Sequence, residues 1–84
     1  MSTTNKPITT LRDGSIKAAI WRNEGEKGPW YSVTITRIYT DDASGKVQET
    51  NSFSNGELLK VAHLATRAYD AVARLKDQDK AAAQ

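Results

Sequence analysis

The first two thirds of the chain alternate between apolar and polar residues in the way that β-strands do. In residues 15–21 apolar side chains fall at every second position, and residues 30–40 continue the alternation with many β-branched and aromatic side chains. Polar segments that contain glycine or proline separate these runs, which is typical of turns. We therefore predict an antiparallel meander with strands at 15–21, 30–40 and 46–53, joined by loops at 22–29 and 41–45.

A shorter strand is predicted upstream of the meander. Residues 8–11 are β-prone, and Asp13-Gly14 separates them from the next β-prone run. Asp-Gly between two such runs is a strong signal for a tight hairpin. The expected sheet therefore has three to four antiparallel strands.

The last third of the chain has helical periodicity. Ser54 and Glu57 fit a capping box, in which a serine and a glutamate three residues later satisfy backbone N–H groups at the start of a helix. Apolar residues then recur at helical spacing as far as Leu75, while charged residues share the opposite face. We predict one long amphipathic C-terminal helix packed on one sheet face, which gives an α+β fold of order ββββα.

The apolar arc of this helix is wide. Leu59 and Leu64 are expected at its two flanks, where they extend it beyond what one small sheet needs. The excess of apolar surface indicates a second protomer. The predicted dimer interface consists of Leu59, Leu64, Tyr69, Val72 and Leu75.

The strand register can be predicted by requiring that apolar residues share a face. A slip of one residue would move a strand's apolar side chains to the other face, so the requirement is selective. The second hairpin, closed around 41–45, also places Arg37 opposite Glu49, a favourable charge pair. The predicted pairs are Trp21 with Trp30, Ile20 with Tyr31, Ala18 with Val33, Ile16 with Ile35, Tyr39 with Val47, Arg37 with Glu49, and Val33 with Phe53.

A chain of 84 residues is expected to form one domain. We expect residues 1–6 to be disordered, residues 7–76 to form the domain, and the polar residues 77–84 to fray. The chain has no cysteine and a formal charge of +2. No apolar run approaches the ~20 residues of a membrane helix. We expect a cytoplasmic protein without membrane contact.

No constellation of residues indicates an enzyme. The only histidine, His63, is predicted on the charged face of the helix, and Glu24 and Glu26 flank a glycine in a predicted loop. The run 24–28 lacks the spacing of a phosphate-binding loop. We expect no catalytic residues, no metal site and no cofactor.

The outer face of the predicted sheet carries the most informative residues. Trp21 and Trp30 lie there among hydroxyl side chains, with Arg22 and Lys27 beside them. Indole rings stack on unpaired bases, while cations and hydroxyls bind phosphates. The face is therefore predicted to bind single-stranded nucleic acid. A structural role, in which the two indoles stabilise the hairpin as a cross-strand pair, fits the residues about as well.

A resemblance to a known family supports the first interpretation. Its carriers are Leu11-Arg12-Asp13, the run 33–39, Gly45-Lys46, the strand-to-helix junction 52–59 and the late-helix run 70–75. In this order they resemble the PC4-like (transcriptional coactivator p15) and whirly group of single-stranded DNA-binding proteins, from about Leu11 to Leu75. The resemblance implies a homodimer joined through helices and sheet ends, with strands bound along the outer sheet faces. It implies Lys17, Arg37, Tyr39 and Lys46 as contacts.

The expected function is single-stranded nucleic-acid binding, as an accessory factor in transcription or replication. The alternative is a protein-interaction module, such as a phage- or plasmid-encoded adaptor or inhibitor, because exposed tryptophans are also common anchors in protein interfaces. The predicted nucleic-acid contacts are Lys17, Trp21, Arg22, Lys27, Trp30, Thr34, Arg37, Tyr39 and Lys46.

Overall fold

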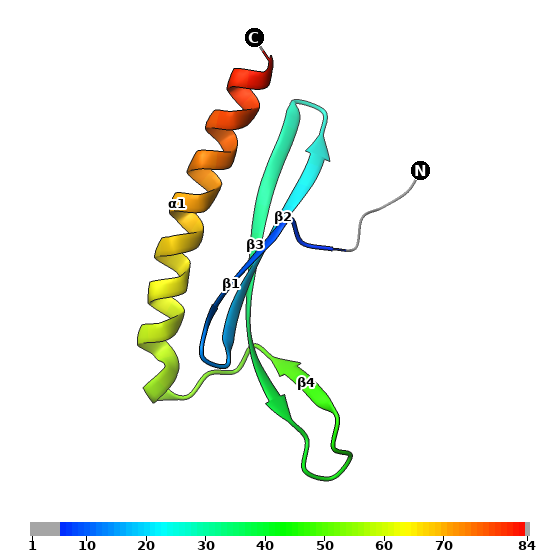
Figure 1. Cartoon of the computed structure of the whole chain (residues 1–84), viewed down its shortest axis with the longest axis vertical. Helices are drawn as coiled ribbons and strands as arrows, with labels where there is room; N and C mark the ends of the chain where they lie inside the picture. The colour runs from blue at the N-terminus through cyan, green and yellow to red at the C-terminus, as the bar shows by residue number, and fades with distance from the viewer. Residues whose placement is uncertain (1–5, 84) are drawn as a thin grey trace.

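The computed structural model describes residues 6–83 and confirms the predicted α+β fold. One antiparallel sheet in the order β1-β2-β3-β4 is followed by a single long helix (Figure 1). Apart from Lys6, the residues expected to be disordered at the N-terminus lie outside the described range. The elements are β1 (Thr9–Asp13), β2 (Ile16–Gly25), β3 (Gly28–Thr40), β4 (Val47–Thr50), a 3₁₀ turn η1 (Asn55–Glu57) and α1 (Leu58–Ala83).

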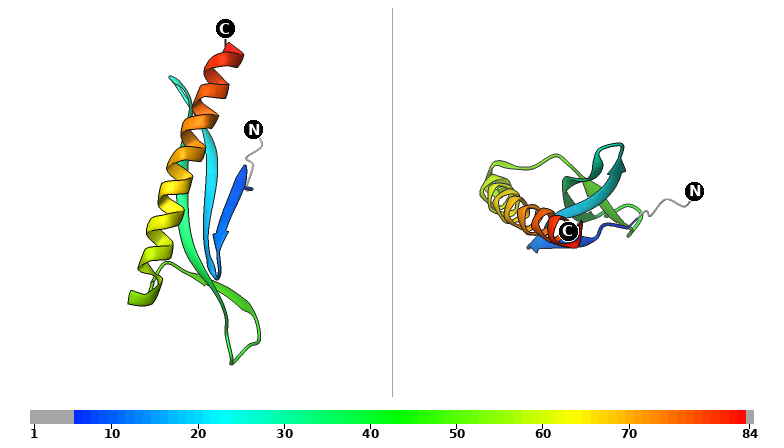
Figure 2. Two further views of the ribbon diagram at one scale, coloured as in Figure 1. Left: turned by 60° about the vertical axis from the view of Figure 1, so that its left-hand side comes forward. Right: turned by 90° about the horizontal axis from the view of Figure 1, so that it is seen from above.

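The sheet and the helix form two layers, with α1 lying along one face of the sheet (Figure 2). The helix contacts β2 and β1 more extensively than β3. Ile16, Ala18 and Leu64 are fully buried where the layers meet. Burying a large aliphatic side chain contributes about 1.5–3 kcal/mol, so this small cluster holds the two layers together. Leu11, Ile35, Phe53 and Val61 pack around it.

The hairpin between β2 and β3 is longer than predicted. Residues 22–29 do not form a loop, because both strands continue to a turn of only two residues between Gly25 and Gly28. Gly28 has a φ of 116°, which side chains with a Cβ rarely adopt. The register consequently differs by two residues from the predicted one, with Trp21 opposite Ser32 and Ile20 opposite Val33. An even shift leaves every side chain on its predicted face.

The predicted register of the β3–β4 hairpin is wrong by one residue. Asp41 N–H donates to the Lys46 carbonyl at 2.9 Å, and the Asp41 carboxylate accepts a hydrogen bond from Ala43 N–H at 3.0 Å. This turn places Thr40 opposite Val47 and Ile38 opposite Glu49. An odd shift moves side chains to the other face.

All three pairs predicted for this hairpin fail, and Tyr39 lies opposite Gln48 instead of Val47. Glu49 lies on the face away from the helix and does not face Arg37, whose partner is Thr50. The pair of Val33 with Phe53 does not form, because β4 ends at Thr50 and Phe53 lies in the segment that leads to the helix, where it packs against the core.

The helix begins where the capping box predicts. The Glu57 carboxylate accepts a hydrogen bond from the Ser54 backbone N–H at 2.9 Å, and this bond lowers the pKa of Glu57. Arg37 Nε lies 3.4 Å from the same carboxylate. The start of the helix is therefore held by its own capping box and by Arg37 of β3.

The C-terminal end of the helix was expected to fray from residue 77, but α1 continues to Ala83. Tyr31 of β3 donates a hydrogen bond to the Asp79 carboxylate at 2.5 Å, and Arg22 Nη2 lies 3.8 Å from that carboxylate. These contacts hold the last turns of α1 against the β2–β3 hairpin. Gln84 lies outside the described residues.

Leu64 is at the centre of the buried helix face, not at its flank. Its side chain is 0% exposed, so it belongs to the core, and its assignment to a dimer interface is wrong. Leu59 is 83% exposed and Tyr69 is 78% exposed, so both are available for contacts with another molecule. Within residues 6–83 no helix is both long and apolar enough to cross a membrane.

Candidate nucleic-acid interface

The face of the sheet that points away from α1 is called the outer face below. Strand alternation places on it every second residue of each strand, and residues directly opposite in the register share a face. Most of these side chains are polar, as the alternation predicts for the solvent side of an antiparallel sheet. The outer face consists of Thr10 and Arg12 of β1, Lys17, Ala19, Trp21 and Asn23 of β2, Trp30, Ser32, Thr34, Thr36, Ile38 and Thr40 of β3, and Val47 and Glu49 of β4.

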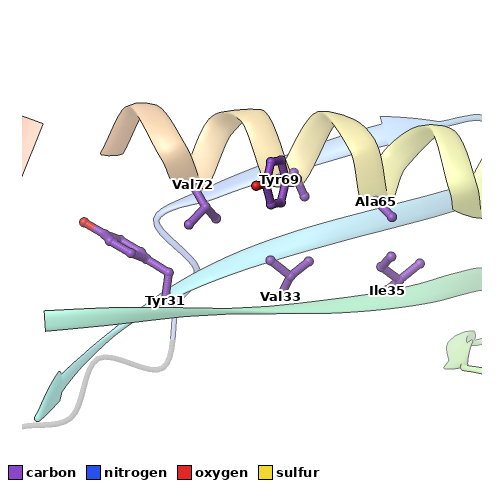
Figure 3. A pocket seen from close by; sticks show the side chains of 7 residues that line it. Tyr31, Val33, Ile35, Ala65, Tyr69 and Val72 are labelled. Atoms are coloured by element: carbon purple, nitrogen blue, oxygen red, sulfur yellow. The ribbon is translucent and has the colours of Figure 1, made fainter. Parts of the chain in front are cut away.

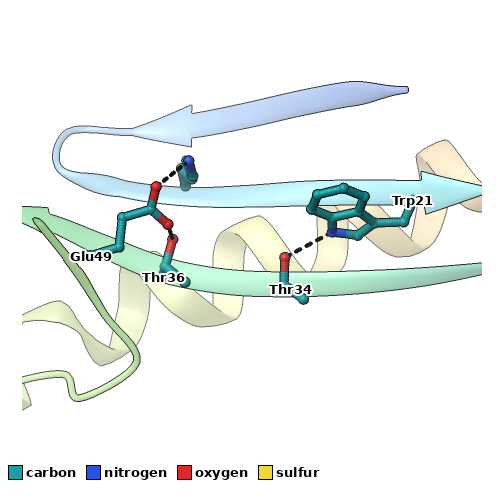
Figure 4. Close-up of polar contacts among 5 residues, drawn as sticks. Trp21, Thr34, Thr36 and Glu49 are labelled. Carbon is teal, nitrogen blue, oxygen red and sulfur yellow. Dashed lines mark hydrogen bonds and ion pairs between the residues drawn. The ribbon is translucent and has the colours of Figure 1, made fainter. Parts of the chain in front are cut away.

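The Trp21 side chain is fixed in place on this face. Its indole Nε1–H donates a hydrogen bond to the Thr34 hydroxyl of β3 at 3.0 Å (Figure 4). The ring is therefore held across the two central strands and is half-buried. An aromatic ring with a fixed orientation loses little conformational entropy when a base stacks on it.

Trp30 is the more exposed of the two indoles, with 53% of its surface accessible. It lies opposite Asn23, so the predicted direct pair of Trp21 with Trp30 does not form. Asn23 instead donates to the Ser32 hydroxyl at 3.2 Å. Only the direct opposition of the two indoles is wrong, because Trp21 and Trp30 are still diagonal neighbours on adjacent strands. A structural role for them in the hairpin stays a prediction. Both rings remain on the same face.

Lys17 is paired with a carboxylate. Its Nζ lies 2.8 Å from Glu49, which also accepts a hydrogen bond from the Thr36 hydroxyl at 3.1 Å (Figure 4). The bond from Lys17, and secondarily that from Thr36, lowers the pKa of Glu49. The predicted register had placed Glu49 on the opposite face. Its presence here reduces the positive charge that Lys17 offers to a phosphate.

Arg12 supplies a cation that the list of predicted contacts omitted. It is exposed on β1 and lies directly opposite Lys17 in the register. Like charges directly opposite each other are unfavourable unless an anion lies nearby, and Glu49 compensates only one of the two. The alternation of residues 9–13 would have placed Arg12 on this face, had the short first strand been extended to Asp13.

Three predicted contacts lie on the helix side of the sheet. Arg22 forms ion pairs with Glu24 and Asp79. Its pKa is raised, first by hydrogen bonding to Tyr31 and then by these carboxylates.

The other two are Arg37 and Tyr39. Arg37 Nε donates to the Ser52 carbonyl at 3.4 Å, and its guanidinium lies 5.6 Å from the centroid of the Tyr39 ring. Arg37 belongs to the junction with the helix, and Tyr39 lies next to it on the same face of the β3–β4 hairpin. A strand bound to the outer face would therefore contact neither of them, nor Arg22.

Two further predicted contacts lie in turns. Lys27 occupies the tight turn between β2 and β3, and Lys46 lies in the turn before β4. Both are exposed. The structure therefore gathers a smaller set than predicted on the outer face, namely Arg12, Lys17, Trp21, Trp30 and Thr34.

No family model, curated protein or solved structure was found to match the chain. The resemblance to the PC4-like and whirly group therefore stays a prediction. Among residues 6–83, no three side chains of the metal-binding types gather closely enough to hold an ion.

Proposed function

We propose that this chain is a cytoplasmic single-stranded nucleic-acid-binding protein that uses the outer face of its sheet. The observation that carries the proposal is the exposed Trp30 ring on the same face as the fixed Trp21 ring, with Arg12 opposite Lys17 farther along the strands. Stacking platforms beside a line of cations are the combination that binds unpaired strands without sequence preference.

The two kinds of residue would contribute differently. Stacking of a base on an aromatic side chain is worth about 1–3 kcal/mol, which corresponds to roughly a 5- to 150-fold change in affinity. Each cation that contacts a phosphate adds a term that weakens with salt, with a slope of about −0.7 for a single strand. Arg12 is the better candidate for such a contact, because Lys17 is paired with Glu49.

A fluorescence titration with oligo-dT at low salt tests this proposal directly. Tryptophan emission is expected to change on binding, and Trp30→Ala is expected to weaken binding by about 5- to 150-fold. Arg74→Gln is the matched control, because Arg74 is exposed on α1, away from the outer face, and its substitution should leave binding unchanged. A wild-type protein whose emission and anisotropy do not respond to the strand at low salt would overturn the proposal.

The charge contribution needs a separate experiment. Arg12→Gln should reduce the slope of log affinity against log salt by about 0.7, while its effect at high salt should be small. An unchanged slope would mean that Arg12 does not contact phosphate.

The alternative function is a protein-interaction module that uses the same indoles. Trp30 would then be a hot spot, since half-exposed tryptophans are frequent anchors of protein interfaces. Retention of a defined host protein on immobilised wild-type chain after nuclease treatment, lost with Trp30→Ala and kept with Arg74→Gln, would support this alternative.

A further inference from the structure

β3 has a long free edge. It pairs with β2 along its length from Gly28 to Arg37, but with β4 only from Arg37 to Thr40. Along residues 28–36 the second edge of β3 therefore has no partner strand in the described part of the chain. Unpaired edges attract other strands, and proteins usually protect them with charges, prolines or short lengths. Here the segment has no charged residue, and only Pro29 at its start offers protection.

The backbone groups on this edge can be identified from the ladder. Ile38 N–H donates to the Ser15 carbonyl on the β2 side at 2.8 Å. Because backbone groups of successive residues in a strand point to alternate sides, the even-numbered residues of β3 bond to β2. The N–H and C=O groups of Tyr31, Val33 and Ile35 consequently point outward from the free edge.

The side chains of the same three residues line an apolar groove. Together with Ala65, Tyr69 and Val72 of α1, they surround an open volume of about 330 Å³ between strand and helix (Figure 3). Val33 is 37% exposed there. The groove and the free edge are thus formed by one strand.

The flank of α1 beside this groove continues the apolar surface. At helical spacing it presents Leu58, Ala62, Ala65, Tyr69 and Val72, and the first charged residue of this stripe is Lys76, one turn beyond the groove. The other flank, beside β1, carries the charges of Lys60, His63 and Arg67, and His63 Nδ1 lies 3.4 Å from Asp13. The two sides of one helix therefore differ, and the side toward the free edge suits an apolar neighbour.

The chain is also longer and thinner than a compact domain of its size. Its radius of gyration is 15.3 Å, whereas a compact domain of this length has a value of about 12 Å. The molecule measures 52 × 32 × 16 Å, a long and thin shape. Such a shape leaves much of the apolar surface near an edge.

We infer that the free edge of β3 pairs antiparallel with β3 of a second copy of this chain, around a two-fold axis at Val33. Antiparallel pairing about Val33 sets Tyr31 opposite Ile35 of the second copy, with both on the helix side. It sets Ser32 opposite Thr34 on the outer face. Each of the outward-pointing residues then exchanges backbone hydrogen bonds with its opposite number. Both copies use the same surface in this contact, as a two-fold axis requires.

The helices complete the contact. The exposed Tyr69 ring projects beside the groove of its own chain, so a two-fold axis places the Tyr69 of each copy near the groove of the other. A protruding ring next to an open groove is self-complementary. A second copy would therefore pair the free backbone groups of the edge, fill the groove and cover the apolar flank of the helix.

This pairing would extend the proposed binding face. The outer faces of two sheets would become one continuous surface, with Trp21 and Trp30 of each copy on it. That consequence rests on the proposed function, but the pairing itself is tested without nucleic acid, so that failure of one can be told from failure of the other.

Sedimentation velocity combined with amide hydrogen exchange tests the inference. The wild-type chain at tens of micromolar is expected to sediment as a dimer, with the amides of Tyr31, Val33 and Ile35 protected from exchange. Tyr69→Arg is expected to shift the mass to that of a monomer and to expose these amides. Because Tyr69 is 78% exposed, this substitution should leave the fold of the single chain intact, as circular dichroism can verify.

Arg67→Glu serves as the control, because it changes the charge at an exposed position of α1 even more than Tyr69→Arg does, by two units and not one, but lies on the charged flank. It should remain dimeric. A wild-type chain that still sediments as a monomer at about 100 µM, where a dimer with a Kd of tens of micromolar would be the main species, would overturn the inference. A dimer in which the Val33 amide exchanges freely would also overturn it, because the copies would then meet elsewhere.

Discussion

Leu64 shows how much of this fold depends on single residues. It is fully buried between α1 and β2. The core contains few other fully buried side chains, namely those of Ile16, Ala18 and Ile20. A small domain has little reserve, because less of its surface is buried on folding than in a larger protein.

Leu64→Ala is therefore expected to lower the free energy of unfolding by about 2–5 kcal/mol. Leu59→Ala provides the comparison, because Leu59 is 83% exposed in the single chain. Urea denaturation at a concentration where the chain is monomeric measures both. Equal effects of the two substitutions would contradict the assignment of Leu64 to the core.

The contact of Tyr31 with Asp79 makes a second prediction at this scale. The hydrogen bond to Asp79 raises the pKa of Tyr31, with burial adding to the effect. A raised pKa in the folded state means that the contribution to stability is present below the ordinary tyrosine value of about 10 and is lost as the pH rises through the folded value.

We expect wild type to lose stability above pH ~10 more steeply than Tyr31→Phe, which lacks the ionisable group. Thermal midpoints from pH 8 to 11 (a range chosen about the ordinary tyrosine value) measure the difference. The same substitution should speed amide exchange near Asp79. Parallel pH profiles for the two proteins would argue against the contact.

At the scale of elements, the faces of the strands were more predictable than their pairing. Alternation alone identified Ile16, Ala18 and Ile20 as the helix side, and their burial confirms it. Pairing depends in addition on the length of the turn. The polar run 22–29 has the composition of a loop, yet it closes in two residues. Gly28 adopts a positive φ there, and Gly25 has no Cβ to crowd the Gly28 carbonyl.

The candidate site followed the same rule. Trp21, Trp30 and Thr34 were placed on the outer face correctly, because the alternation of side chains along each strand is enough to assign their face. Glu49 was misplaced, because its face depended on the turn 41–46, where hydrogen bonds within the loop add one residue to the register. Contacts between distant segments, such as Tyr31 with Asp79, leave no local signal in a sequence.

The junction between sheet and helix predicts an acid sensitivity. The pKa of Glu57 is lowered, chiefly by the Ser54 backbone N–H. A lowered pKa in the folded state gives a contribution that is present above the ordinary glutamate value of about 4.3 and is lost as the pH falls through the folded value.

Glu57→Gln should therefore be less stable than wild type at neutral pH, and the difference should shrink as the pH falls below ~4. Thermal midpoints between pH 7 and 2.5 measure it (limits chosen about the ordinary value). Glu26→Gln, in the exposed β2–β3 turn, is the control and should follow wild type at every pH. A constant difference would show that the cap acts through its shape and not its charge.

At the scale of the whole molecule, pairing through β3 would make stability depend on concentration. Association of folded chains stabilises them by mass action, so the thermal midpoint of a dimer rises with protein concentration. Differential scanning calorimetry from about 5 to 500 µM should show this rise for wild type but not for Tyr69→Arg. An equal midpoint at all concentrations for both proteins would indicate a chain that is stable alone.

The two-residue turn between β2 and β3 also has a consequence for the order of folding. Closing so short a loop costs little entropy, and isolated hairpins form in about 1–10 µs. Leu64, in contrast, must meet Ile16 across 48 residues of sequence, and α1 leaves the ribosome after all four strands. The hairpin should therefore form while the helix that covers its apolar face is still being synthesised. During that interval the nascent chain presents both a bare face and an unprotected strand edge, and α1 is the element whose docking ends the exposure of the face.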